Sequence, residues 1–139
     1  MIVVALVAIA TGLATFALRD PSASRLEQEA ARLTAVLEAA RAQARAAGLP
    51  VRWEPTVDKA GLALGYRFIG LPDATEPAHE ASWLNEGVSA EIVGGRAVVL
   101  GPEPLIPEQR IVLRLDTRQL TLATDGLAPF AITDQQGTP

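Results

Sequence analysis

MIVVALVAIATGLATFAL, residues 1–18, followed by SRLEQEAARLTAVLEAARAQARAAG, residues 24–48, determines how the rest of the chain must fold. The first stretch carries no charged side chain, and the second is amphipathic and rich in strong helix formers. We therefore predict one long N-terminal helical stem in two halves. The apolar half is long enough to cross a bilayer, and the amphipathic half presents a domain beyond the membrane surface.

The uncharged half is predicted to be a retained membrane span. As a helix, its residues cover about 27 Å, close to the hydrocarbon thickness of a bilayer. A buried core helix would normally keep a polar stripe, and a cleaved signal peptide would carry a basic start and a small-residue cleavage site. The predicted membrane-anchoring side chains are Ile2, Val3, Val4, Leu6, Val7, Ile9, Leu13, Phe16 and Leu18.

The amphipathic half is predicted to be a helix from about Ser24 to Ala47. Its start is either Asp20 with Pro21, or the capping box from Ser24 to Glu27, and we expect a kink or short break before it. Gly48 suits the left-handed position that ends a helix. A narrow apolar stripe runs along the helix and is predicted to dock on the chain's own sheet, with a coiled-coil seam as the alternative. Its members are Leu26, Ala30, Leu33, Leu37, Ala40 and Ala44, whereas Arg25, Glu27, Arg32, Glu38, Arg41 and Arg45 lie off it.

The chain after Gly48 has the period-two pattern and turn residues of short strands. Residues 51–54 alternate until Pro55, and a loop at 56–61 leads to a strand at 62–69. Trp83 and Leu84 are predicted to tuck onto the core. Residues 88–93 and 96–100 are predicted to form a hairpin around Gly94 and Gly95, which supply the positive φ angles of a tight turn.

Two further predicted strands carry the alternating leucines and isoleucines of residues 111–122. A turn at Asp125 and Gly126 then leads to a last strand around residues 130–132. The predicted fold is α+β, a long helix packed on an antiparallel β-domain. Its divisions are a transmembrane half at 1–18, an amphipathic helix at 19–48, a β-domain at 49–133 and a flexible polar tail at 134–139.

Composition excludes several functional classes. The formal net charge of −4 gives no basic footprint for nucleic acid, and the absence of cysteine excludes a disulfide scaffold and a thiolate metal site. His79 is the only histidine, no serine lies in a nucleophile-elbow motif, and the glycines lack phosphate-loop spacing. The acidic loop with Asp73, Glu76 and Glu80 is predicted to be solvated. We therefore expect no enzyme, cofactor or metal.

Four features together resemble pseudopilin H, a minor pseudopilin family of the type II (general) secretion pathway within the type IV pilin-like class. They are residues 18–21 (LRDP), the Arg/Ala/Leu-rich helix ending in Gly48, residues 101–105 (GPEPL) and residues 124–130 (TDGLAPF). The resemblance covers essentially the whole chain. It implies a single-pass inner-membrane protein with a periplasmic C-terminal domain, near the tip of a short filament that serves protein export across the outer membrane.

The same resemblance implies partners and processing. The partners would be other major and minor pseudopilins, the inner membrane and secreted substrate proteins. Members of the family begin with a basic leader and a Gly-Phe-Thr-Leu-x-Glu segment, cut after the glycine, and the new N-terminal phenylalanine is methylated. Residues 1–4 (MIVV) resemble the family's residues directly after that glutamate, so the given start is expected to lie inside the membrane segment.

An alternative within the same fold is a minor pilin that acts in DNA uptake, which would need a cluster of basic side chains to meet phosphate. The only support for this alternative is that folding could bring four arginines close together, namely Arg96, Arg110, Arg114 and Arg118. A periplasmic enzyme or ligand-binding domain on a membrane anchor is a third alternative, and it lacks a convergent polar cluster.

Overall fold

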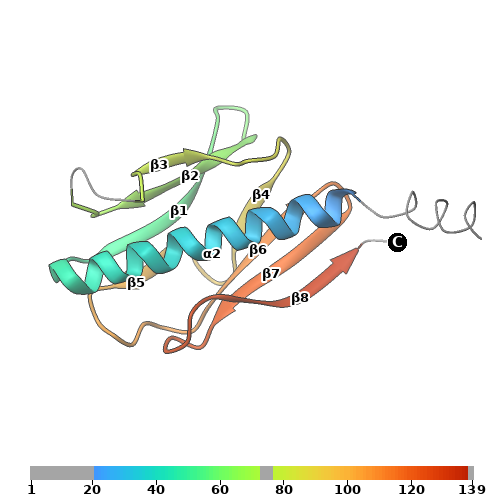
Figure 1. Cartoon of the computed structure of the whole chain (residues 1–139). Coiled ribbons are helices and arrows are strands. Elements are labelled where there is room, and N and C mark those ends of the chain that lie inside the picture. The colour runs from blue at the N-terminus through green and yellow to red at the C-terminus, as the bar shows by residue number, and fades with distance from the viewer. Residues whose placement is uncertain (1–20, 73–76, 138–139) are drawn as a thin grey trace, which may run out of the picture.

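The computed structural model describes residues 21–72 and 77–137, and it confirms the α+β class: one helix packs on two antiparallel sheets (Figure 1). The helix is α2 (Pro21–Ala47). The strands are β1 (Val51–Val57), β2 (Ala63–Ile69), β3 (Glu80–Ser82), β4 (Ser89–Ile92), β5 (Val98–Gly101), β6 (Gln109–Leu115), β7 (Arg118–Thr124) and β8 (Ala131–Gly137). The strand orders are β3-β2-β1-β5 in the first sheet and β4-β6-β7-β8 in the second.

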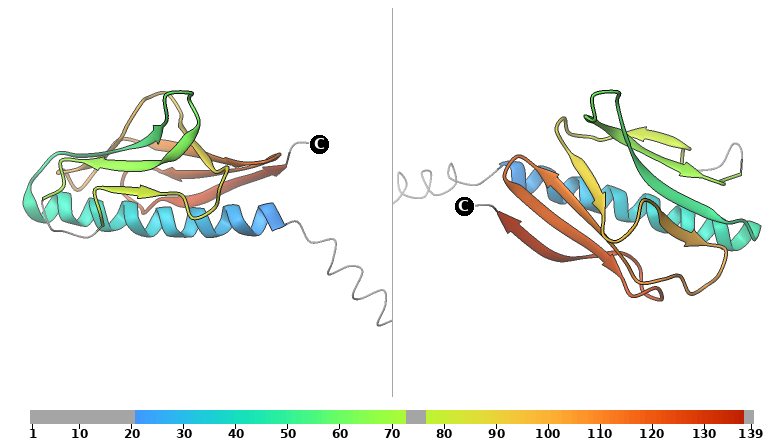
Figure 2. Two further views of the ribbon diagram at one scale, coloured as in Figure 1. Left: turned by 90° about the horizontal axis from the view of Figure 1, so that it is seen from above. Right: turned by 180° about the vertical axis from the view of Figure 1, so that it is seen from behind.

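Helix α2 lies along one side of both sheets (Figure 2), in contact with β7, β5, β6 and β1. The six residues of the apolar stripe are at most 2 % exposed and belong to the main core cluster. Burial of one such leucine contributes about 1.5–3 kcal/mol, so the stripe is a large source of stability. The alanine-rich end allows close approach, because a Cβ on Gly101 of β5 would lie only 2.8 Å from the Cβ of Ala44.

The ends of α2 follow from local chemistry. The described helix is already formed at Pro21 and continues through Ser24, so the capping box from Ser24 to Glu27 does not mark its start. At the other end, Gly48 has φ +65°, and the Leu49 amide donates to the Ala44 carbonyl at 3.1 Å, the pairing that closes a Schellman motif.

The first sheet carries an aromatic core. Trp53, Tyr66 and Phe68 are at most 4 % exposed, and Tyr66 packs edge-on against Trp83 with ring centroids 5.2 Å apart. Leu84, expected to be buried with Trp83, is instead 59 % exposed. The sequence predicted that Pro55 ends the first strand, but β1 continues to Val57. Strand β1 pairs with β5 only from Val51 to Trp53, so no backbone N–H is needed at Pro55 on the β5 side.

The predicted hairpin of residues 88–100 is wrong. Strand β4 pairs with β6 in the second sheet, whereas β5 pairs with β1 in the first. Gly94 has φ +76°, as predicted, whereas Gly95 lacks the predicted positive φ, and the turn carries the chain from one sheet to the other. The Gln109 side chain of β6 ties the two sheets together, since its amide accepts from the Val99 amide at 2.6 Å and donates to the Val99 carbonyl at 2.9 Å.

The C-terminal segment also differs from the prediction. Residues 134–137, expected to belong to a flexible tail, extend β8, which pairs with β7 as far as Gly137 opposite Arg118. Backbone pairing needs no apolar side chain, so a polar sequence at the edge of a sheet gives no sign of it. A shift in pairing between Thr121 and Leu122 accommodates the strand.

Candidate assembly surface of the helix and loops

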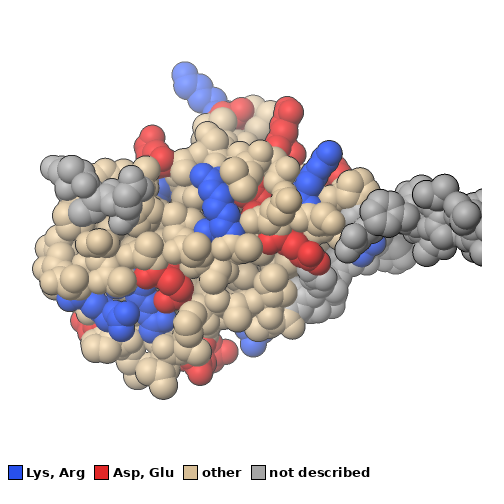
Figure 3. All heavy atoms as spheres, in the orientation of Figure 1, with Lys and Arg blue, Asp and Glu red and all other residues tan. Residues whose placement is uncertain are grey.

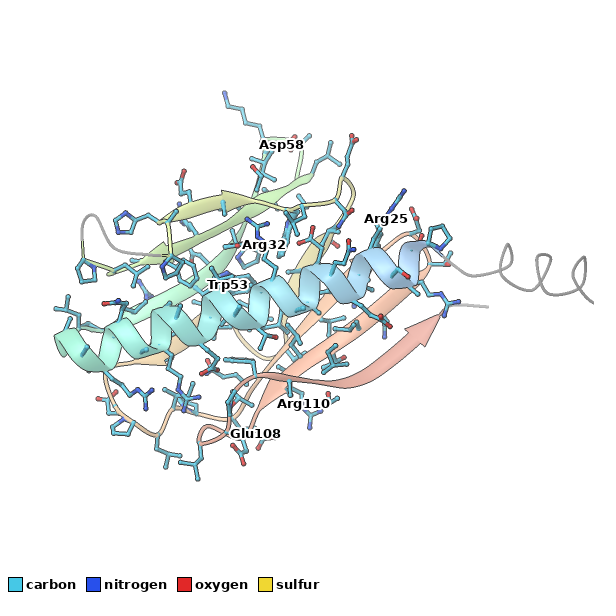
Figure 4. The ribbon with its side chains drawn as sticks, in the orientation of Figure 1. Arg25, Arg32, Trp53, Asp58, Glu108 and Arg110 are labelled. Atoms are coloured by element: carbon cyan, nitrogen blue, oxygen red, sulfur yellow. The ribbon has the colours of Figure 1, made fainter. Side chains whose placement is uncertain are left out.

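Polar side chains on both flanks of the buried stripe join α2 to loops of the β-domain. Toward the N-terminal half, Glu29 is 1 % exposed, and its Oε1 accepts the Asn85 amide at 2.6 Å. One turn along, Arg32 donates to the Ser82 carbonyl at 3.0 Å. These contacts, which we call the Glu29 clamp, hold residues 82–85 and the Trp83 ring against the helix. Figure 4 shows Arg32 and Trp53 on this side of α2.

The Glu29 clamp also sets the surroundings of Tyr66. The Arg32 guanidinium carbon lies 6.0 Å from the centre of the Tyr66 ring. Burial raises the pKa of the Tyr66 hydroxyl above its ordinary value, while the Arg32 charge acts in the opposite direction. Burial therefore favours the neutral form of the Tyr66 hydroxyl.

The opposite flank carries a second set of contacts, the Arg41 clamp. Arg41 is 3 % exposed and donates to the backbone carbonyls of four loop residues: Ala128 at 3.2 Å, Pro104 at 3.1 Å, Leu127 at 3.4 Å and Gly126. Glu38 lies 3.7 Å from Arg41 and accepts the Phe130 amide at 3.0 Å. One guanidinium thus joins the β5–β6 and β7–β8 loops to the helix.

The burial of Arg41 corrects the prediction that it lies off the buried stripe. At helical spacing, Arg41 flanks Leu37 and Ala44, so the loops that fold over this flank enclose it. The sequence carried a weak signal, because Glu38 and Arg41 stand three residues apart. A surface ion pair has the same spacing, and nothing in the sequence shows that loops cover this one.

The opposite face of α2 is exposed and lined with small side chains. Its exposed alanines are Ala31, Ala35, Ala39, Ala42 and Ala46. Charged residues Arg25, Glu27 and Arg45 are exposed at its borders. The buried stripe packs on the chain's own sheets, which favours docking over the coiled-coil alternative for those residues. The small side chains of the exposed face would allow close approach of another helix.

Two groups of aliphatic side chains are exposed on opposite sides of α2. The hairpin patch consists of Val57, Leu62 and Leu64 at the β1–β2 connection, each at least 54 % exposed. The loop patch consists of Leu105 and Leu127, which are 64 % and 73 % exposed. In Figure 4, the Asp58 label lies on the side of the hairpin patch, and the Glu108 and Arg110 labels lie on the side of the loop patch. The period-two pattern predicted the strand, but Leu62 precedes β2, Leu64 lies at a shift in the pairing of β2 with β1, and both side chains are exposed.

Two of the four arginines that could have formed a nucleic-acid site lie next to carboxylates. Arg114 donates to Glu91 at 2.6 Å, Arg110 lies 3.8 Å from Glu108, and Arg118 also interacts with other residues. On the face shown in Figure 3, basic and acidic side chains are interspersed over a largely uncharged surface. Phosphate binding needs several unneutralised cations together, and the ion pairs of Arg110 and Arg114 act against this.

Candidate chemical groups have structural roles in the described residues. The His79 ring lies 3.1 Å from the Leu71 carbonyl, within hydrogen-bonding distance. Asp125 accepts the amides of Leu127 and Ala128, each at 2.9 Å, and these hydrogen bonds lower the pKa of its carboxyl group. Residues 21–72 and 77–137 hold no group of three or more His, Asp or Glu side chains placed to bind a metal. Glu80 is exposed, while Asp73 and Glu76 fall outside the described residues.

The other predicted structural positions are turns. Gly126 has φ +101°, and a Cβ there would lie 1.9 Å from the Ile106 carbonyl oxygen, so only glycine allows the two loops to meet. Gly95 follows Gly94 in an exposed turn. Within residues 21–72 and 77–137, no helix is both long and apolar enough for a membrane span. The predicted anchor, residues 1–18, lies outside the described part of the chain.

Comparison of the chain with known protein families, characterised proteins and solved structures found no match. The function therefore has to be argued from the chain's own residues.

Proposed function

We propose that this chain is a structural subunit of a pilin-like filament, a minor pseudopilin of the type II secretion pathway that takes part in protein export across the outer membrane. Residues 1–18 would anchor it in the inner membrane. The described domain would lie in the periplasm and contact other pseudopilins and secreted proteins. The proposal assigns the chain no catalytic step.

The observation that supports this proposal most strongly is the relation between α2 and the apolar run. Helix α2 begins at Pro21, two residues after the Arg19 that ends the uncharged stretch. Its buried stripe is fully used by the chain's own sheets, and its other face stays exposed. A membrane-length segment that leads into a helix with one free face suits a subunit that packs side by side with others.

The two clamps support a scaffolding role. The buried charged side chains Glu29 and Arg41 fix irregular loops on the helix. In a catalytic domain, buried charged side chains would instead be expected around a cleft. A charge removed from water is costly unless it has partners, and here the partners are backbone groups, the Asn85 side chain and the Glu38 carboxylate. These contacts attach loops of the β-domain to the helix.

The alternative role in DNA uptake has less support. It needs exposed basic side chains that act together, and Arg110 and Arg114 have carboxylate partners. Deletion of the gene in its native host separates the two roles. We expect export of secreted proteins to stop and DNA uptake to continue. Continued export with loss of uptake would overturn the secretion proposal.

A further inference from the structure

The hairpin patch lies where the pairing of β1 with β2 becomes irregular. Phe68 and Tyr66 of β2 are 4 % and 2 % exposed, but Leu64, at the shift in pairing, and Leu62, just before the strand, are 54 % and 67 % exposed. Beside Leu64 lies an open hollow of about 480 Å³, lined by Thr56, Leu64, Glu80, Ala81 and Ser82. The hairpin thus offers an apolar surface with space beside it.

The loop patch projects and is held in place. The Ile106 amide donates to the Gly126 carbonyl at 3.2 Å, so the loops bearing Leu105 and Leu127 are joined directly. The Arg41 clamp holds both loops from beneath, through Pro104 and residues 126–128. A preorganised surface loses little conformational freedom on binding, which favours association. Exposed leucines on such a fixed support are typical of an interaction site.

We propose that the loop patch of one copy of this chain seats on the hairpin patch and its hollow on a second copy. The shapes match, since the two leucines project and the space beside Leu64 is hollow. The charges match as well: exposed Arg45 lies one turn beyond Arg41, and exposed Glu80 lines the hollow. Glu103 and Lys59 are a second pair of opposite charges on the loop side and the hairpin side.

We expect contact between different patches rather than identical ones. Two loop patches in contact would leave the hollow beside Leu64 unfilled, and two hairpin patches would leave the projecting Leu105 and Leu127 uncovered. The proposed contact joins different surfaces on opposite sides of α2 (Figures 1 and 4). Such a head-to-tail contact does not close on itself after two copies and continues as a ring or a helical row.

The positions of the two patches along α2 set the displacement between neighbouring copies in the row. The hairpin patch is level with Arg32, which donates to Ser82, and Ser82 pairs with Gly65 next to Leu64. The loop patch is level with Arg41. These positions are nine residues apart, on the order of 14 Å along a helix. Copies with parallel helices would therefore be displaced by about that distance, as in a filament. The inference rests on the described domain alone and does not require the secretion role.

Cysteine crosslinking tests the contact directly, because the chain has no cysteine of its own. Full-length Leu127→Cys and Leu64→Cys variants, purified in mild detergent, are treated with a short bifunctional maleimide alone and as an equal mixture. We expect crosslinked dimers in the mixture and none in either variant alone. Ala39→Cys, exposed on the free face of α2, is the control and should not crosslink to Leu64→Cys.

Dimers formed by either variant alone, equal crosslinking to the control, or no crosslinking in the mixture would each overturn the proposal. Sedimentation gives an independent test. Leu127→Asp and Leu64→Asp should each weaken self-association roughly tenfold or more, because a charge replaces a buried leucine. Mixed together, they retain one intact contact and should form dimers but no longer rows. A mixture as monomeric as each variant alone would also overturn the proposal.

Discussion

Replacing Arg41 should destabilise the domain far more than replacing Arg45, one turn further along the same helix. Arg41 is 3 % exposed and binds four loop carbonyls as well as lying near Glu38, whereas Arg45 is exposed. The two substitutions remove the same side chain from the same helix. The difference between them isolates the clamp from helix propensity and net charge.

The expected size follows from the contacts. A hydrogen bond to a charged group contributes about 1.5–3 kcal/mol to stability. Loop carbonyls that lose Arg41 near the surface can form hydrogen bonds with water instead, which offsets part of the lost free energy. Breaking a buried charge pair typically costs about 3–5 kcal/mol, and we expect Arg41→Ala to fall in this range. Arg45→Ala should stay within about 0.5 kcal/mol of the parent.

Arg41→Lys should be intermediate. A single ammonium group keeps the charge but cannot reach carbonyls of both loops in the planar arrangement that a guanidinium allows. The Arg41 Nε has no hydrogen-bond partner among the described residues, so losing this atom does not add to the destabilisation.

Urea and thermal unfolding of the chain from residue 21 onward measure all three variants. At roughly 4 °C per kcal/mol for a domain of this size, Arg41→Ala should lower Tm by about 12–20 °C. Amide hydrogen exchange at residues 126–128 should accelerate in the same variant. Equal stabilities of Arg41→Ala and Arg45→Ala would refute the reasoning and make the clamp an incidental contact.

Three other predictions can be checked with the same protein. Leu37→Ala, at a fully buried position of the stripe, should cost about 2–5 kcal/mol, while the same change at Leu62, 67 % exposed, should cost little; equal unfolding midpoints would contradict the docking of α2. The pKa of Asp125 is lowered by backbone hydrogen bonds, so its share of stability is complete above the ordinary value of 3.8 and is lost as pH falls through the lower folded value. Asp125→Asn should therefore be less stable than the parent at neutral pH, and this gap should narrow in acid; a gap that stays constant in unfolding curves across pH would contradict the assignment. The domain should not bind fluorescent duplex DNA appreciably at physiological salt, and micromolar or tighter binding there would favour the DNA-uptake alternative.

Periodicity predicted the helix and its buried stripe because α2 keeps one regular contact line from Leu26 to Ala44. The strands bearing Ile111, Leu113, Leu120 and Leu122 were equally predictable, since each is buried on one face only. In these segments, local pattern and tertiary contact agree.

Strand partners were not predictable in the same way. Gly94 and Gly95 encode a turn, but nothing local states whether the chain after it returns to β4 or crosses to β1. The alternation of residues 62–68 likewise does not show that the pairing of β1 with β2 shifts at Leu64, so Leu62 and Leu64 looked as buried as Tyr66.

The anchoring loops depended on contacts distant in sequence. Glu29 and Arg41 read as surface charges on a helix, and their partners lie 56 residues away at Asn85 and 63 to 87 residues away between Pro104 and Ala128. Such pairs emerge only from the finished fold. The polar part of β8, residues 134–137, was missed for a related reason, because its pairing is made by backbone alone.

The central claim, a membrane-anchored domain facing the periplasm, is tested most directly by labelling one thiol in intact cells. Lys59 is exposed in the β1–β2 loop, and Lys59→Cys would carry the only cysteine in the chain. We expect the full-length variant to stay with the membrane after alkaline extraction. A maleimide small enough to pass the outer membrane, but unable to cross the inner membrane, should label it without cell lysis. A chain that leaves the membrane on extraction, or is labelled only after lysis, would contradict the claim.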